Sequence, residues 1–217
     1  MDASELASLN HRLKDAEPLD LVRFAVERGG DDSLVSTNFR PLEAVVLHLA
    51  TTVKPDLRVL WADHGCNLPE TYRFAENCRQ RLNLNIHSFV PTMTAAHWTA
   101  LHGPIPAPDE VERVEAFSRI MKLEPFFRGL ETMAPKVWIT GLRRVQNPRR
   151  QNLEPLEWDP QRQVLKVNPV LEWTDEQMHA YLQQHDLPDE RTYYDPAKGD
   201  EKHECGLHAP LTTAAAR

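Results

Sequence analysis

The sequence predicts an α/β protein with a mainly parallel sheet flanked by helices. Three short apolar segments, 33–36, 57–62 and 85–90, have the length and composition of buried strands. Segments with apolar residues at helical spacing lie between and around them. Strands that alternate with helices favour a parallel sheet, whose ligands bind beyond the carboxyl ends of its strands.

The first half of the chain supplies most of this pattern. Residues 18–28 have helical periodicity and stop at Gly29-Gly30, a common helix end. The strand predicted at 33–36 leads through a short turn to a helix at 42–51, with Pro41 suited to its first turn. The strand at 57–62 is followed by an amphipathic helix over 69–82, for which Asn67 and Glu70 resemble a cap.

The second half continues the alternation less regularly. Three prolines make 102–112 a loop, and a helix follows to about residue 130. Residues 136–140 form a predicted strand, and 164–170 a strand expected at the sheet edge because Asn168-Pro169 interrupts it. Thr174–Gln177 is a capping box for a helix through residue 184. We therefore expect one α/β domain over residues 1–188 and a polar carboxyl-terminal tail over 189–217.

Composition and charge exclude several classes of protein. A net charge of -7 argues against a general nucleic-acid binder, which needs a basic face. The amino terminus lacks the pattern of a secretory signal, and the longest apolar stretch, 44–50, is too short to span a membrane. Three cysteines at irregular spacing indicate a reducing cytoplasm rather than a disulfide framework. They are also too few for a four-cysteine metal or iron–sulfur site.

Three loops at predicted strand ends could bind an anionic ligand. The loop 36–41 combines hydroxyl and amide side chains with a helix start, and a turn that merely caps the helix explains it equally well. Asp63, followed by His64 and Gly65, could accept a hydrogen bond from a nucleoside, or could stabilise a surface turn. The loop 141–150 holds four arginines, which suit phosphate and sulfate oxygens but also occur in solvated loops.

Cys205 is the candidate nucleophile because it lies in a polar, glycine-containing tail, HECGLH. An accessible thiol becomes reactive when a nearby cation stabilises its thiolate. An idle cysteine on an exposed tail is the alternative that these residues leave open. Metal binding by His203, Cys205 and His208 is not expected, since three ligands within six residues make a poor tetrahedral site.

Six stretches in this order resemble the phosphoadenylyl-sulfate reductase family, from about Asp32 to His208. They read STNFRPLEAVVLHL, VLWADHGCNLPETYRF, MKLEPFFRGL, WITGLRRVQNPRRQNL, KVNPVLEWTDEQMHAYLQQHDLP and ECGLH. The resemblance implies a Rossmann-like fold of the adenine-nucleotide α-hydrolase type and a catalytic Cys205. The positions that match the family's substrate pocket are Ser36, Thr37, Asn38, Phe39, Arg40, Asp63, Gly65, Lys122, Arg143, Arg144, Gln146, Arg150 and His208.

The resemblance also implies the reaction. Cys205 would attack the sulfur of 3′-phosphoadenylyl sulfate, forming an S-sulfocysteine and releasing adenosine 3′,5′-bisphosphate. Reduced thioredoxin or glutaredoxin would then release sulfite. Members of the family often form homodimers, and that assembly is an expectation here too.

Cysteine count separates the branches of this family. Relatives that reduce adenylyl sulfate usually carry a [4Fe–4S] cluster on paired cysteines, whereas residues 117–121, before Lys122, contain none. A cluster-free enzyme with the 3′-phosphorylated substrate is therefore predicted, with a cluster-free adenylyl-sulfate reductase as the alternative. Two other readings remain. An ATP-cleaving enzyme of this fold would need an SGGxDS loop, which is absent here, and a non-catalytic nucleotide-binding homologue would not need ECGLH.

Overall fold

The fold is a single six-stranded sheet between two layers of helices, in a computed structural model that describes residues 1–196. The strands, in chain order, are β1 (Ser33–Thr37), β2 (Arg58–Ala62), β3 (Asn85–Phe89), β4 (Val137–Ile139), β5 (Leu156–Asp159) and β6 (Val164–Val167). Their order in the sheet is β3-β2-β1-β4-β6-β5. All neighbours pair in parallel except β5, which is antiparallel to β6.

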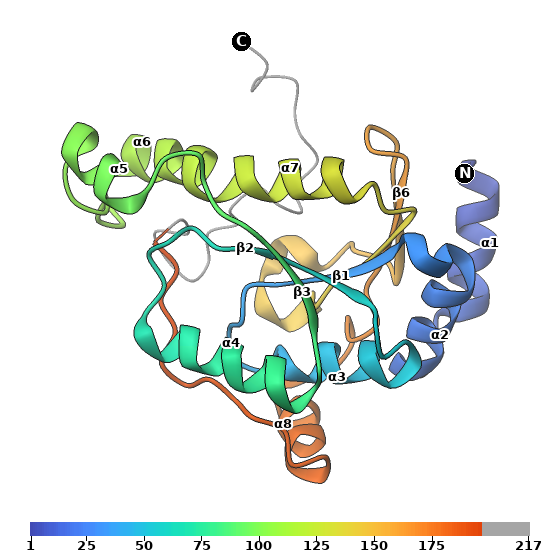
Figure 1. Ribbon diagram of the computed structural model, residues 1–217. Helices are drawn as coiled ribbons and strands as arrows, with labels where there is room; N and C mark the ends of the chain where they lie inside the picture. The colour runs from blue at the N-terminus through green and yellow to red at the C-terminus, as the bar shows by residue number, and fades with distance from the viewer. Residues whose placement is uncertain (197–217) are drawn as a thin grey trace.

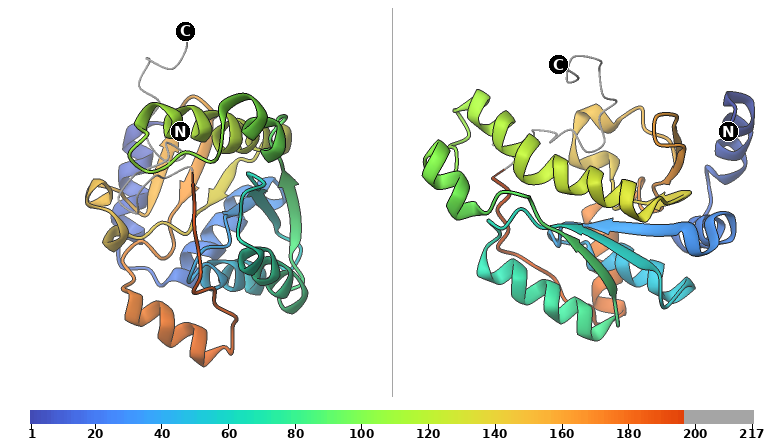
Figure 2. Two further views of the ribbon diagram at one scale, coloured as in Figure 1. Left: turned by 90° about the vertical axis from the view of Figure 1, so that its left-hand side faces the viewer. Right: turned by 45° about the horizontal axis from the view of Figure 1, so that its top comes forward.

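Helices cover both faces of this sheet (Figure 1). The α-helices are α1 (Ala3–Leu13), α2 (Pro18–Gly29), α3 (Ala44–Val53), α4 (Pro69–Arg81), α5 (Ala95–His102), α6 (Val111–Phe117), α7 (Glu124–Met133) and α8 (Asp175–Gln184). A π-helical turn (Ser118–Leu123) joins α6 to α7 and makes them one long rod along one face, while α3, α4 and α8 lie on the other (Figures 1 and 2).

Alternation along β1 explains why two cores form. Val35 points toward the core shared with α2 and α3, and Leu34 points toward the core under α7; both side chains are fully buried. A strand with both faces covered is apolar on both, as parallel sheets require. Burial of these apolar surfaces holds the helices against the sheet and fixes its carboxyl edge as the place where the connecting loops meet.

Most of the predicted elements are confirmed. The helices predicted at 18–28 and 175–184 are α2 and α8, and Thr174 caps α8 in a capping box with Gln177. The strands predicted at 33–36, 57–62 and 136–140 are β1, β2 and β4. The helix predicted from residue 42 begins at Ala44, because Leu42 has a φ of 71° that no helix accommodates.

Two local predictions were wrong. The strand near residue 164 is not an edge strand: β6 ends at Val167, so Pro169 lies beyond its ladder, and the unpredicted strand β5 forms the edge instead. Asn67 does not cap α4. Leu68 occupies the cap position with Pro69 in the first turn, and the Asn67 amide donates to Asp63 Oδ1 at 2.9 Å.

Candidate functional site

The candidate site lies at the carboxyl edge of the sheet, where the connections from neighbouring strands lead to opposite sides. From β1 the chain goes to β2 on one side, whereas β4 lies on the other side of β1. In open α/β sheets this reversal leaves a crevice at the carboxyl edge that binds ligands. The loops after β1, β2 and β4 therefore meet at one edge, as the sequence predicted for the three candidate loops.

The loop after β1 is shaped by Phe39 and Glu43. Phe39 is fully buried with a φ of 52°, and its ring packs edge-on against Trp61 with centroids 4.9 Å apart. The Glu43 carboxylate accepts from Thr37 Oγ1 at 2.5 Å and from the Asn38 backbone amide at 2.9 Å. The chain's own carboxylate thus takes hydrogen bonds that the sequence suggested for an external anion.

Two further residues of this loop differ in how they are engaged. Ser36 Oγ accepts from Trp138 Nε1 at 2.8 Å, so its hydroxyl faces the α7 side of the sheet. Arg40 is partly buried, and its Nε has neither solvent contact nor a hydrogen-bond partner among residues 1–196. A partly buried guanidinium whose Nε has no partner within residues 1–196 suits an anion.

The loop after β2 is organised by Asp63. Its Oδ1 accepts from the Gly65 amide at 2.9 Å and from the Tyr72 hydroxyl at 3.0 Å, besides the bond from Asn67. Gly65 has a φ of 72°, a conformation that side chains rarely adopt. One carboxylate oxygen of Asp63 therefore shapes the turn, and a contact of Asp63 with a nucleoside stays a prediction.

A buried charged cluster lies beside this loop. His64, Lys122 and Asp195 have side chains no more than 3% exposed. Lys122 Nζ donates to Asp195 Oδ2, and His64 Nε2 lies 3.9 Å from Asp195 Oδ1. Burial lowers the pKa of His64 to about 4; the Asp195 carboxylate opposes this shift and the Lys122 ammonium adds to it. The imidazole is therefore neutral at pH 7, and Lys122 and Asp195 neutralise each other.

The arginine loop after β4 is held by internal partners. Arg143 is 3% exposed and its Nη1 lies 2.6 Å from Asp175 Oδ1 at the start of α8. Arg144 makes a two-pronged contact with Glu172, with Nη2 at 2.5 Å and Nε at 3.0 Å. Arg150 is buried and donates to Gln146 Oε1. These contacts order the loop and place two guanidinium groups, those of Arg143 and Arg150, inside the protein.

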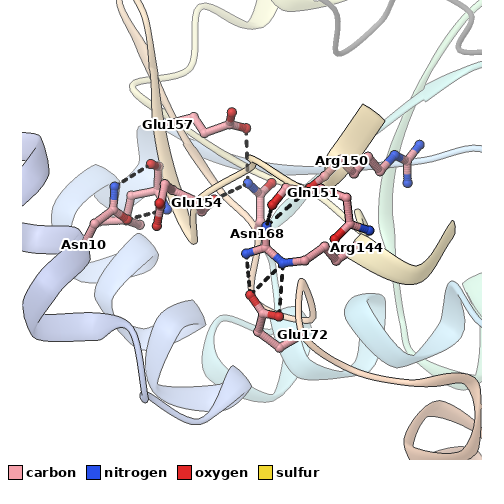
Figure 3. Close-up of polar contacts among 9 residues, drawn as sticks. Asn10, Arg144, Arg150, Gln151, Glu154, Glu157, Asn168 and Glu172 are labelled. Carbon is pink, nitrogen blue, oxygen red and sulfur yellow. Dashed lines mark hydrogen bonds and ion pairs between the residues drawn. The ribbon is translucent and has the colours of Figure 1, made fainter. Parts of the chain in front are cut away.

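A second polar cluster, centred on Asn168, holds the ends of this loop (Figure 3). The Asn168 side chain accepts from Thr140 Oγ1 at 2.6 Å and donates to the Glu154 carbonyl at 2.8 Å. These bonds join the residues just after β4 and β6 to the segment that follows the arginine loop. Both ends of the loop are therefore fixed to the sheet.

The two cysteines in the described part of the chain are not activated. Burial raises the pKa of the half-buried Cys66 thiol, and the nearby Asp63 charge adds to the increase. Burial also raises the pKa of Cys78 to about 12. A thiol that stays protonated is a poor nucleophile. The predicted nucleophile Cys205, and His208, lie outside the residues that the structure describes.

Sequence reasoning missed three side chains of this edge: Glu43, Tyr193 and Asp195. Tyr193 Oη lies 3.4 Å from Asp195 Oδ2. When the nitrogen of the Asn38 side-chain amide faces Glu43, Tyr193 Oη donates to the oxygen of that amide at 3.0 Å. Burial raises the pKa of Tyr193, so its hydroxyl stays protonated. Residues 189–196 form no helix or strand, so no periodic pattern marks Tyr193 or Asp195.

A separate cavity of about 470 Å³ lies at the opposite edge of the sheet, where β4 and β6 begin. Its cations are already paired: Lys136 lies 2.7 Å from Asp32, and Arg162 lies 3.0 Å from Asp159. Within residues 1–196, no cluster of three His, Cys, Asp or Glu side chains could hold a metal ion. No helix in that range is long and apolar enough to cross a membrane.

Comparison with known proteins identifies the family. The model of the phosphoadenosine phosphosulfate reductase domain matches residues 33–195. A phosphoadenosine 5′-phosphosulfate reductase of Synechocystis sp. is 33% identical over 234 residues, covering 97% of this chain and 93% of that protein. One from Alkalilimnicola ehrlichii is 37% identical over 184 residues, covering 85% and 74%.

Solved structures agree on the fold. A phosphoadenylyl-sulfate reductase from Candida auris, in a phosphate complex, has a TM-score of 0.75 at 20% identity and covers 88% of this chain and 90% of that one. An NH3-dependent NAD synthetase from Campylobacter jejuni has a TM-score of 0.53 at 11% identity, covering 86% and 75%.

The fold described above is an α/β fold of the adenine-nucleotide α-hydrolase type, with the arginine loop at its switch point. The family match over most of the chain makes this more specific. The chain belongs to the phosphoadenosine phosphosulfate reductase domain family.

Proposed function

We propose that this chain reduces 3′-phosphoadenylyl sulfate to sulfite and adenosine 3′,5′-bisphosphate. The observation that carries this is the family match over residues 33–195, together with relatives of that name aligned along 84% or more of the chain. ECGLH at residues 204–208 supplies the nucleophile that the reaction needs. The cations at the carboxyl edge favour the substrate with the additional negative charge of a 3′-phosphate over adenylyl sulfate, which lacks that group.

The chemistry follows from a thiol. The Cys205 thiolate attacks the sulfate sulfur, an S–S bond forms, and the bond from sulfur to the bridging oxygen breaks. Adenosine 3′,5′-bisphosphate leaves with the electron pair of that bond. A donor thiolate then attacks Cys205 Sγ, and sulfite departs with the pair of the S–S bond. The second thiol of the donor resolves the mixed disulfide, so the dithiol supplies both electrons and Cys205 is regenerated.

The described residues have proposed roles in binding. Arg40, Lys122, Arg143 and Arg150 would offset charge on the sulfate and phosphate oxygens, which is the largest contribution that a protein makes to such a transfer. Asp63 and the Gly65 turn would contact the nucleoside. Ser36, Thr37, Asn38 and Phe39 shape the loop beneath the phosphosulfate, while Arg144 and Gln146 order the arginine loop. His208 follows Cys205 closely and is proposed to act beside it.

Thioredoxin or glutaredoxin is the proposed electron donor, because the cycle requires a small dithiol protein and no resident metal or cluster. A cytoplasmic location follows from the same requirement, since thiols are kept reduced there. A homodimer is proposed from the resemblance alone.

The experiment is a sulfite-release assay on wild type, Cys205→Ser and Cys78→Ala. It uses 3′-phosphoadenylyl sulfate and adenylyl sulfate in turn, with reduced thioredoxin. We expect turnover of the 3′-phosphorylated substrate that disappears in Cys205→Ser. Cys78→Ala is the matched control, because Cys78 lies on α4 and its side chain is buried in the core. Wild type that releases no sulfite from either nucleotide, with glutaredoxin also tried, would overturn the proposal.

A further inference from the structure

Residues 189–196, here called the strap, cross the carboxyl edge of the sheet after α8. Figures 1 and 2 show them running from the α8 side of the sheet to the side of the α6–α7 rod. Three contacts hold the strap down. Asp189 Oδ1 accepts from the Leu42 backbone amide at 2.9 Å, and Asp195 pairs with Lys122. Tyr193 Oη donates to the Asn38 side-chain oxygen when the nitrogen of that side chain faces Glu43. The strap is therefore part of the site, and it lies ahead of Cys205 in the chain.

Two of these contacts use side chains proposed to bind substrate. Tyr193 is the hydrogen-bond partner of the Asn38 side chain in the loop after β1. The Asp195 carboxylate accepts a hydrogen bond from the Lys122 ammonium. Lys122 and Asp195 are each 2% exposed, so water does not screen the charges around them. An incoming oxyanion that approached Lys122 would meet a carboxylate in a buried, low-dielectric environment. Two anions so close together repel each other, so the oxyanion and Asp195 compete for Lys122.

The neighbouring groups do not relieve this competition. Burial keeps His64 neutral, with a pKa lowered to about 4, so the imidazole adds no positive charge at pH 7. Tyr193 Oη stays protonated because burial raises its pKa. The full positive charge that the structure describes against Asp195 is that of Lys122.

We propose that Asp195 stands in for the oxyanion of the substrate. In the free protein its carboxylate holds the Lys122 ammonium; on binding, a sulfate or phosphate oxygen replaces it, and the strap is released. Cys205 follows Asp195 by ten residues in the sequence. Release of Asp195 therefore links binding of an anion at Lys122 to the start of the segment that carries the nucleophile. Asp195 is thus a positioning residue, and the inference rests on the proposed function.

The test is nucleotide binding by full-length Cys205→Ser protein, which cannot turn over. Calorimetry with adenosine 3′,5′-bisphosphate would compare this protein with versions that also carry Asp195→Asn or Asp189→Asn. Asp195→Asn keeps the shape but removes the competing charge, so we expect affinity to rise by about fivefold or more, the lower end of ordinary coupling between sites. Asp189→Asn makes the same change in net charge away from Lys122 and should raise affinity much less. Asp195→Glu should restore the original affinity.

A measurement on protein with an unaltered strap keeps the test valid if Asp195→Asn does not fold. Hydrogen exchange of the strap should speed up when adenosine 3′,5′-bisphosphate binds the Cys205→Ser protein. Slower or unchanged exchange, or weaker binding by Asp195→Asn, would overturn the inference while leaving the proposed function intact. Absence of both nucleotide binding and wild-type sulfite release would instead reject the proposed function.

Discussion

Asn168 has a side chain at the carboxyl edge whose amide oxygen and nitrogen are both hydrogen-bonded. It is fully buried and accepts from Thr140 Oγ1. It donates to the Glu154 carbonyl and, at 3.2 Å, to Glu157 Oε2 (Figure 3). Buried polar groups are costly when left unpaired. One amide therefore fixes the ends of two strands and the segment that leaves the arginine loop.

Replacing this amide should destabilise the protein. Asn168→Ala leaves the Thr140 hydroxyl and the Glu154 carbonyl without their partner, so we expect a loss of about 2–4 kcal/mol in the free energy of unfolding. Urea unfolding followed by circular dichroism measures it. Asn85→Ala is the matched control, because the exposed Asn85 amide makes one bond, to the Asp56 carbonyl at 3.1 Å. Equal losses in the two variants would contradict the role given to Asn168.

Single residues also show where sequence reasoning stops. The loops that hold Asp63, Lys122 and Arg143 could be chosen from the sequence because each follows a predicted strand or matches a family motif. Their partners could not. Lys122 pairs with a carboxylate 73 residues away, in a segment without regular structure, and no local pattern encodes such a pairing.

At the scale of elements, predictability followed the strength of periodicity and caps. Helix α8 was predicted with its boundaries because Thr174 and Gln177 form a capping box. Helix α1 was not predicted, since only Leu9 among its residues is buried and its pattern is mostly polar. Strand β5 has four residues and two charges, and its identity depends on the hairpin with β6 rather than on its own composition.

The packing of α7 on the sheet depends on Gly129. A Cβ at this position would come within 2.6 Å of a Leu60 methyl and 2.9 Å of the Phe89 ring. Alanine raises helix propensity by about 1 kcal/mol over glycine. Overpacking a core costs about 1–3 kcal/mol. The clash is with two side chains of neighbouring strands, so we expect the packing cost to exceed the gain.

Gly129→Ala should therefore lower the melting temperature despite its better helix propensity. The expected net loss is up to about 2 kcal/mol, from the difference between these two magnitudes. Calorimetric unfolding checks it. Thr132→Ala, at an exposed position of the same helix, is the control and should change stability by no more than about 0.5 kcal/mol. Stabilisation by Gly129→Ala would show that Leu60 and Phe89 move aside without cost.

At the scale of the whole molecule, the site depends on chain topology. The reversal of strand order between β1 and β4 brings together loops that are about a hundred residues apart in sequence. The α/β alternation predicted that the loops would meet at this edge, and the parallel pairing of β1, β2 and β4 confirms that they do. The return of the chain across the same edge as the strap was not predictable, because residues 189–196 have neither periodicity nor caps.

Burial of His64 under this returning segment should make folding sensitive to acid. The pKa of His64 falls from 6.5 to about 4 on folding, chiefly by burial, while the charges of Asp195 and Asp63 oppose the shift and that of Lys122 reinforces it. Between these two pH values the unfolded chain binds a proton that the folded chain does not. Stability is therefore full above about pH 6.5 and declines as the pH falls toward 4.

The difference between wild type and His64→Asn isolates this contribution. Asparagine keeps an acceptor for the Cys66 amide, which now donates to His64 Nδ1 at 3.1 Å, but does not titrate. From pH 7 to pH 4, wild type should lose about 2–3 kcal/mol more than the variant, from the size of the pKa change. Urea unfolding at half-unit pH steps measures both curves, and exposed His11→Asn should follow wild type. Parallel curves for wild type and His64→Asn would mean that the folded protein protonates His64 as readily as the unfolded chain does.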